Sequence, residues 1–180
     1  MVNGGSPTLV GSARYLSVLA PVPDALGERI ASWRARHTPA QHHHAHITVH
    51  VCREPAHLAA RLEVMQRRVA DHGPVAISLG EPASFEPESP VTYLPVTRGA
   101  QHLYSLNQLS AQVLGPSASP FPFIPHLTLG MRLPAPVLAE SLRHFAQIPE
   151  ELVHFEVDQL LVSEYESGQW WDHAVIPLRR

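Results

Sequence analysis

The chain has 180 residues, and its 13 Lys and Arg against 16 Asp and Glu give it a formal net charge of −3. This length suits one domain with a sizeable core, and the acidity argues against the broad basic surface that binds long nucleic acids. All 13 cations are Arg, which excludes a Schiff-base lysine, a P-loop lysine and a lysyl-nucleotide intermediate. The sequence shows neither an apolar run long enough to span a membrane nor a leader peptide. We therefore expect a cytoplasmic monomer that does not enter membranes.

Strands and helices are predicted to alternate after a flexible N-terminus at residues 1–13. Short apolar or alternating runs predict the strands, and apolar side chains at i, i+4 and i+7 predict the helices. In chain order we expect a strand at 14–20, a helix at 24–37, a strand at 46–51, a helix at 58–69, a strand at 75–79, a loop at 80–90, a strand at 91–96, a helix at 103–113, a connector at 115–125, a strand at 126–131, a helix at 134–147, and strands at 155–164 and 173–178 joined by a turn at Gly168.

The same order of elements occurs twice in this prediction. Each half reads strand, helix, strand, helix, strand, and the middle strands begin at His46 and His126, which are 80 residues apart. Such a repeat predicts two similar units. We therefore expect an α+β fold in which residues 14–180 form a single bilobal domain. Its two pseudo-symmetric antiparallel-sheet lobes would carry helices on their outer faces and enclose a central cleft.

Both middle strands begin with the triplet His-x-Thr, at residues 46–48 and at residues 126–128. From the composition, chance predicts roughly 0.4 copies in the whole chain. Two copies at matching places of a repeat therefore indicate a shared role. Because side chains alternate along a strand, the histidine and the threonine of each motif point to one face, and the apolar residue between them points to the core.

Two imidazoles and two hydroxyls that face one another across a cleft suit a phosphodiester substrate. An imidazole, with an ordinary pKa of ~6.5, can serve as general base or general acid near neutrality. Threonine hydroxyls can donate hydrogen bonds to the non-bridging oxygens, where charge collects in the transition state. This chemistry requires no metal and no cofactor.

Paired His-x-Thr strands at this separation resemble the two-histidine (2H) phosphoesterase superfamily. Within it, the segment FIPHLTLG (123–130) is similar to the second-motif region of the bacterial 2′-5′ RNA ligase-like (LigT-like) proteins. The resemblance covers both motifs and nearly the whole order of elements. It implies a bilobal fold whose cleft hydrolyses 2′,3′-cyclic phosphates or related cyclic or 2′-5′ linkages, and some members join RNA ends by 2′-5′ bonds without ATP. Carried over by position, His46 and His126 are the catalytic pair, and Thr48 and Thr128 bind the phosphate.

The family often has an arginine soon after the second motif, and Arg132 is the candidate here. By strand parity it shares the face of His126, provided that the strand stays regular through Gly130. Arg98 is a second candidate for a phosphate contact. Tyr93, on an earlier predicted strand, could line the cleft, but packing in the core with its hydroxyl at the rim is the interpretation that we adopt.

The run of histidines before the first motif also allows a metal site. His44, His46 and His50 share strand parity and could approach one ion. A polar strand entrance in a His-rich chain is the interpretation that we adopt, so no metal is expected. Cys52 is the only cysteine, so no internal disulfide can form, and we expect it to fill space in the core.

The leading hypothesis from the sequence is a metal-independent phosphoesterase. It would hydrolyse a cyclic phosphodiester, either the 2′,3′-cyclic phosphate of an RNA end or a small cyclic nucleotide, and no stable protein partner is implied. We favour His126 as the base that activates water and His46 as the acid that protonates the leaving oxygen. Three alternatives stay open: an ATP-independent 2′-5′ RNA ligase that uses the same cleft, a non-catalytic nucleotide- or RNA-binding module, and a metal protein built on the histidine cluster.

Overall fold

Nine strands form one antiparallel sheet within the part of the chain that the structure describes. The structure is a computed structural model that describes residues 14–38, 44–70, 72–166 and 169–179. The predicted flexible N-terminus and the predicted turn at Gly168 lie outside these residues.

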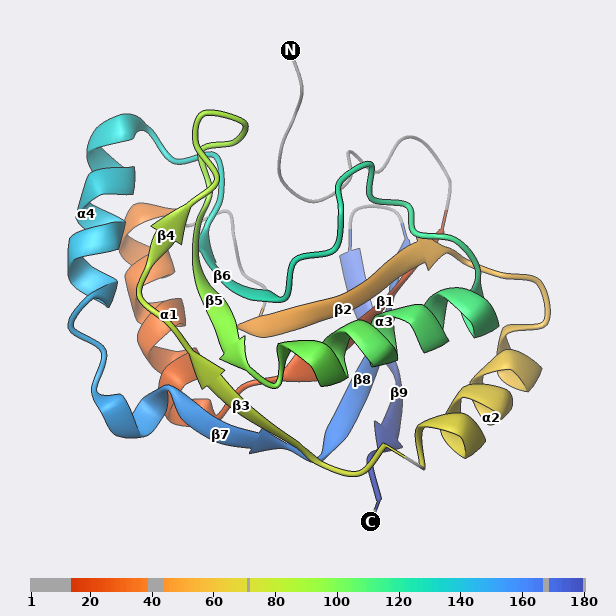
Figure 1. The fold of residues 1–180 in the computed structure, drawn as a ribbon. Coiled ribbons are helices and arrows are strands. Elements are labelled where there is room, and N and C mark those ends of the chain that lie inside the picture. The colour runs from red at the N-terminus through yellow and green to blue at the C-terminus, as the bar shows by residue number, and fades with distance from the viewer. Residues whose placement is uncertain (1–13, 39–43, 71, 167–168, 180) are drawn as a thin grey trace.

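The order of elements agrees with the sequence prediction for every helix and for most strands (Figure 1). The strands are β1 (Tyr15–Pro21), β2 (His46–Arg53), β3 (Val75–Leu79), β4 (Ala83–Ser84), β5 (Thr92–Arg98), β6 (His126–Gly130), β7 (His154–Val157), β8 (Gln159–Glu166) and β9 (Gln169–Pro177). The helices are α1 (Asp24–His37), α2 (Leu58–Val69), α3 (Ala100–Leu114) and α4 (Ala135–Phe145), followed by a 3₁₀ turn at Glu150–Leu152.

Several boundaries differ from the prediction, and three of the differences change the sheet. The short strand β4 lies inside the predicted 80–90 loop, and β6 ends at Gly130, one residue early. The single strand predicted at 155–164 is two strands that separate at Asp158, whose carbonyl accepts a hydrogen bond of 2.7 Å from the amide of Leu178. None of the helices in the described ranges combines the length and the apolar character that crossing a membrane requires.

One continuous sheet contains strands from both halves of the sequence. The strands follow the order β7-β3-β5-β6-β2-β1-β8-β9, with β4 added beside β5. In this order, β8 from the second half of the sequence pairs with β1 from the first half, and β9 follows β8. Likewise β3 from the first half pairs with β5 from the second half. The consecutive sequence halves thus exchange their outer strands. Periodicity predicts which face of a strand is buried and does not predict which strand lies beside it, so the exchange could not be foreseen.

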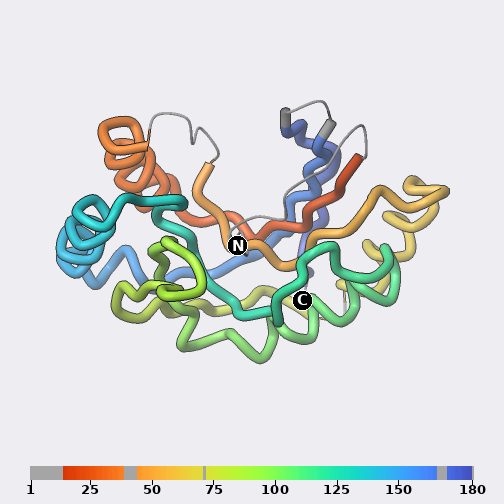
Figure 2. The backbone as a smooth tube through the Cα atoms, turned by 90° about the horizontal axis from the view of Figure 1, so that it is seen from above, coloured from red at the N-terminus to blue at the C-terminus, as the bar shows by residue number. Residues whose placement is uncertain are grey.

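Helices α1 and α3 likewise pack on strands from the opposite half of the sequence. Figures 1 and 2 show α1 and α4 together at one end of the sheet and α2 at the other end. Helix α1 follows β1 in the chain but packs on β6, and α3 follows β5 but packs on β2. Each of these two helices therefore supports the motif strand of the other half.

Helix α1 is fixed to this half of the sheet by a buried tryptophan. Trp33 is fully buried, its indole N–H donates to Oε2 of Glu140 on α4 at 2.9 Å, and its ring lies 5.5 Å from that of Phe145. The end of β6 comes so close to α1 that a Cβ on Gly130 would lie 3.1 Å from the Trp33 ring, and it would also lie 3.0 Å from Leu133. Glycine at this position therefore permits the close approach of strand and helix.

A buried pair of hydroxyls joins α4 to β5, and its loss should be measurable. Thr92 and Ser141 are both fully buried, with 2.8 Å between their oxygens. Thr92→Val leaves the Ser141 hydroxyl without this partner, which should lower the free energy of unfolding by about 1–3 kcal/mol in urea denaturation. Adding Ser141→Ala should recover part of this loss, because neither polar group then remains. Strictly additive effects of the two substitutions would contradict the pairing.

Candidate active site

The two His-x-Thr motifs lie on neighbouring antiparallel strands in the middle of the sheet. Ile47 of β2 pairs with Leu127 of β6. An antiparallel register continued one residue on either side of this pair places His46 opposite Thr128, and Thr48 opposite His126. The two motifs are thus related by a local two-fold axis through the central pair.

All four motif side chains share one face of the sheet. Ile47 and Leu127 are fully buried and face the helices, so the residues on either side of each face the opposite way. The two histidines and two threonines are each half-buried, and solvent therefore reaches part of every one of them. The histidines are diagonal neighbours, for which Cα atoms ordinarily lie about 7–8 Å apart, a separation that leaves room for a phosphate between the rings.

Each imidazole is oriented by a hydrogen bond to the backbone carbonyl two residues before it. Nδ1 of His46 lies 2.7 Å from the carbonyl oxygen of His44, and Nδ1 of His126 lies 2.6 Å from the carbonyl oxygen of Ile124. A carbonyl only accepts, so Nδ1 of each ring is the donor. The neutral form of each ring therefore carries its proton on Nδ1 and its lone pair on Nε2, the nitrogen that can exchange a proton with a substrate.

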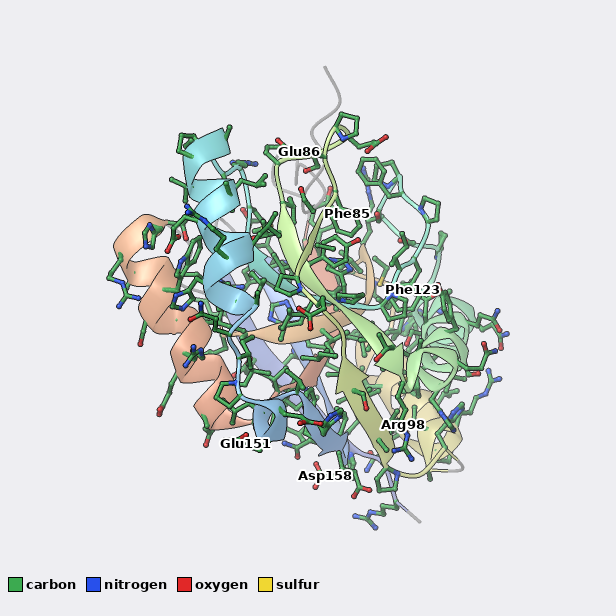
Figure 3. The ribbon with its side chains drawn as sticks, turned by 60° about the vertical axis from the view of Figure 1, so that its left-hand side comes forward. Phe85, Glu86, Arg98, Phe123, Glu151 and Asp158 are labelled. Carbon is green, nitrogen blue, oxygen red and sulfur yellow. The ribbon has the colours of Figure 1, made fainter. Side chains whose placement is uncertain are left out.

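Aromatic rings surround His126. Phe85, from the loop between β4 and β5 (Figure 3), stacks on Tyr93 with 3.9 Å between ring centroids. The His126 ring lies 5.0 Å from Phe85 and 5.3 Å from Tyr93, with its plane steeply inclined to both. Burial lowers the pKa of His126, against a smaller opposite effect of the hydrogen bond to Ile124. The neutral, proton-accepting form of this ring is thereby favoured.

The sequence does not point to Phe85 at the site, and it offers a place in the cleft for Tyr93 only as the less favoured alternative. Tyr93 was expected in the core, but it pairs with Thr128 across the β5–β6 ladder, is half-buried and lies on the face of the motif residues. Phe85 lies in the loop rich in Pro, Glu and Ser, where it is the only aromatic residue. A large apolar side chain in such a loop was the available signal.

A β-bulge follows the first motif and overturns the parity of the histidines. The pairing of β2 with β1 skips Val49, and a bulge shifts the alternation of side chains by one. His50 is 2% exposed, and its Nε2 lies 2.9 Å from the carbonyl oxygen of Gly115, directly after α3. Burial lowers the pKa of this imidazole. The prediction that His50 shares a face with His44 and His46 is therefore wrong.

The two candidate arginines both lie outside the motif strands β2 and β6. Because β6 ends at Gly130, Arg132 lies beyond the strand, in an exposed turn with a left-handed φ of 55°. The strand parity that aligned it with His126 is therefore wrong. Arg98 is exposed and lies at the opposite end of β5 from Phe85 (Figure 3).

The described residues offer no group of three His, Cys, Asp or Glu side chains that could hold a metal ion. His42 and His43 of the histidine run lie outside the described residues. Cys52 is 1% exposed, and burial raises the pKa of its thiol to about 11. Its prediction as a buried core residue is confirmed.

The comparisons with known proteins agree with this geometry. A model of the 2′-5′ RNA ligase superfamily matches residues 22–169, which include both motifs. A protein of Geobacillus thermodenitrificans that carries the name "Putative phosphoesterase" is 32% identical over 111 residues, 59% of this chain and 61% of the relative. The chain thus spans about three fifths of the length of that relative.

Solved structures of Escherichia coli LigT share the fold. The apo form has a TM-score of 0.62 at 16% identity and covers 94% of this chain and 100% of its own. The complex of LigT with 3′-AMP has a TM-score of 0.64 at 18% identity, over 93% of this chain and 99% of its own. At these identities the likeness shows the fold alone. The expected α+β antiparallel fold and the expected resemblance are confirmed: this chain belongs to the 2′-5′ RNA ligase superfamily of LigT-like, two-histidine phosphoesterases.

Proposed function

We propose that this protein hydrolyses a cyclic phosphodiester, the 2′,3′-cyclic phosphate of an RNA end or of a small nucleotide, by general acid–base catalysis from His46 and His126. The observation that carries the proposal is the register of β2 and β6, which sets each motif histidine beside the threonine of the other motif on one accessible face. Membership in the 2′-5′ RNA ligase superfamily, and the likeness to a relative that carries the name "Putative phosphoesterase", support the reaction class.

The proposed step uses His126 as base and His46 as acid. Nε2 of His126 takes a proton from water as the water oxygen forms a bond to phosphorus. Nε2 of His46, protonated at the start, gives its proton to the 2′ or 3′ oxygen as the bond from phosphorus to that oxygen breaks. The product is a phosphomonoester with a free neighbouring hydroxyl, and the two rings exchange their proton through solvent.

The environment of His126 supports its assignment as the base. A base must be neutral before the reaction, and burial against Phe85 and Tyr93 disfavours the charged imidazolium. The hydroxyls of Thr48 and Thr128, which flank the diagonal between the two rings, would donate to the non-bridging oxygens of the phosphate. Arg132 is retained as a proposed further phosphate contact, reached from its turn after β6, and the proposal does not depend on it.

The pH dependence of the rate tests the role of the aromatic rings. If His126 is the base, activity is lost on acidification as its Nε2 becomes protonated, and its lowered pKa places this acidic limb below pH 6.5. Phe85→Ala exposes the His126 ring to water and so weakens the desolvation that lowers its pKa. The acidic limb should therefore move toward higher pH. The control Trp171→Ala, which removes a 59% exposed ring from β9, should leave the limb in place. An acidic limb unchanged in Phe85→Ala would contradict this account.

A substrate panel with chelator present tests the function itself. The panel comprises 2′,3′-cyclic mononucleotides, RNA ending in a 2′,3′-cyclic phosphate, a 2′-5′ oligonucleotide, and two RNA halves bearing a cyclic phosphate and a 5′-hydroxyl. We expect hydrolysis of at least one cyclic phosphate in EDTA, with the phosphate left at a single position. Joined RNA halves would instead assign 2′-5′ ligation, and binding without turnover between pH 5 and 8 would assign a binding module. Activity lost on chelation and restored by metal would assign a metal protein.

A further inference from the structure

Each motif strand has a bulge at the same place. The pairing of β2 with β1 skips Val49, and the pairing of β6 with β5 skips Leu129. Both residues come directly after the motif threonine, so the two bulges are equivalent under the two-fold relation of the motifs. A bulge leaves its extra residue outside the regular ladder and changes the direction of the neighbouring side chains. The orientation of each threonine hydroxyl therefore depends on the bulge that follows it.

The carbonyl of each bulge residue is bound by a side chain from a helix. Nδ2 of Asn107 on α3 donates to the oxygen of Val49 at 2.8 Å. Nε of Arg34 on α1 donates to the oxygen of Leu129 at 2.9 Å, and its Nη2 donates to the oxygen of Thr128 at 2.6 Å. Buried carbonyls outside the ladder require such partners, because leaving one unpaired is costly.

Both donors reach across the molecule. Helix α1 comes from the first sequence half and binds the second motif strand, whereas α3 comes from the second half and binds the first motif strand. Arg34 is 7% exposed, and burial lowers its pKa to about 10, so it still carries its charge at neutral pH. A buried arginine on the apolar side of α1 is costly unless its hydrogen bonds are needed.

We propose that Arg34 and Asn107 are positioning residues, each fixing the motif threonine of the opposite half by binding the carbonyl of the bulge residue beside it. Arg34 acts on Thr128 and Asn107 acts on Thr48. The effect on catalysis rests on the proposed phosphodiester hydrolysis, but the effect on geometry does not.

Crossed double-mutant cycles test this assignment. Arg34→Lys keeps the charge but replaces the planar guanidinium by one ammonium nitrogen, which cannot occupy the positions of both Nε and Nη2. We expect kcat for a 2′,3′-cyclic nucleotide to fall about 10- to 100-fold with a smaller change in KM, as for a misplaced catalytic group. The same substitution should cost less than about threefold in a Thr128→Ala background and keep its full cost in a Thr48→Ala background.

Asn107→Ala should show the opposite coupling, with its cost lost in Thr48→Ala and kept in Thr128→Ala. Asn107 is half-buried, so this variant keeps the test available if Arg34→Lys does not fold. Matched controls are Arg36→Lys on α1 and Gln108→Ala on α3, both exposed neighbours, which should leave kcat unchanged. Equal costs in both threonine backgrounds would overturn the proposal and leave only a general structural role.

A measurement without substrate separates this inference from the proposed function. In NMR spectra, Arg34→Lys should shift the γ-methyl signal of Thr128 and leave that of Thr48, and Asn107→Ala should do the reverse. If the wild-type protein hydrolyses none of the panel but these shifts are selective, the proposed function fails and the positioning inference stands. If both threonine signals move together, or neither moves, the positioning inference is wrong.

Discussion

Replacing either motif histidine by alanine is expected to reduce kcat/KM for 2′,3′-cyclic phosphate hydrolysis by about 10²–10⁴-fold, the usual contribution of general acid or base catalysis. Steady-state kinetics of His46→Ala and His126→Ala measure this directly. His102→Ala, at an exposed position of α3, is the matched control and should retain the wild-type rate. Full activity in either motif variant would refute the two-histidine mechanism.

The leaving group of the substrate distinguishes the acid from the base. A p-nitrophenyl phosphodiester has a leaving group that departs without protonation, so a variant that lacks the acid should regain most of its lost rate on this substrate. We expect this recovery for His46→Ala and not for His126→Ala. Recovery for His126→Ala alone would reverse the assignment of the two roles, and with it the role given to Phe85 and Tyr93.

Loss of a motif threonine hydroxyl should have the second-largest effect. Thr48→Ala and Thr128→Ala are each expected to lower kcat by about 10²–10³-fold, the cost of removing one preorganised donor to a developing negative charge. Thr→Ser at each position keeps the hydroxyl and should retain much of the activity. Both threonines are half-buried on the open face, so thermal unfolding should change little. Serine variants as slow as the alanine variants would contradict a hydrogen-bonding role.

The sequence alone predicted the elements that carry the site. Alternation along each motif strand placed Ile47 and Leu127 on the buried face and the histidines and threonines opposite, and the observed burial agrees. The repeat predicted two equivalent motif strands, and these are adjacent in the sheet with the motifs in register. The alternation within each strand and the repeat of the motif were sufficient for this part, because both can be read directly from the order of residues in the sequence.

The features that orient the site depend on contacts between distant segments and were not predicted. The bulge at Val49 turns His50 away, although uninterrupted alternation would have kept it on the same face of the sheet as His46. Arg34 continues the apolar spacing of Ile30 by one helical turn, and a charged residue at such a position was the signal of a buried hydrogen bond. The carbonyl that it binds, on Leu129, is 95 residues away, and no local pattern reports such a partner.

The pH dependence of log kcat/KM for wild type and both histidine variants tests the central claim most directly. Two imidazoles that act on one phosphorus as base and acid should give the wild-type protein a bell-shaped profile. His126→Ala should lose the acidic limb and keep the alkaline limb, and His46→Ala should lose the alkaline limb and keep the acidic one. A bell that persists with both limbs in either variant would show that the groups titrating in the reaction are not these two histidines.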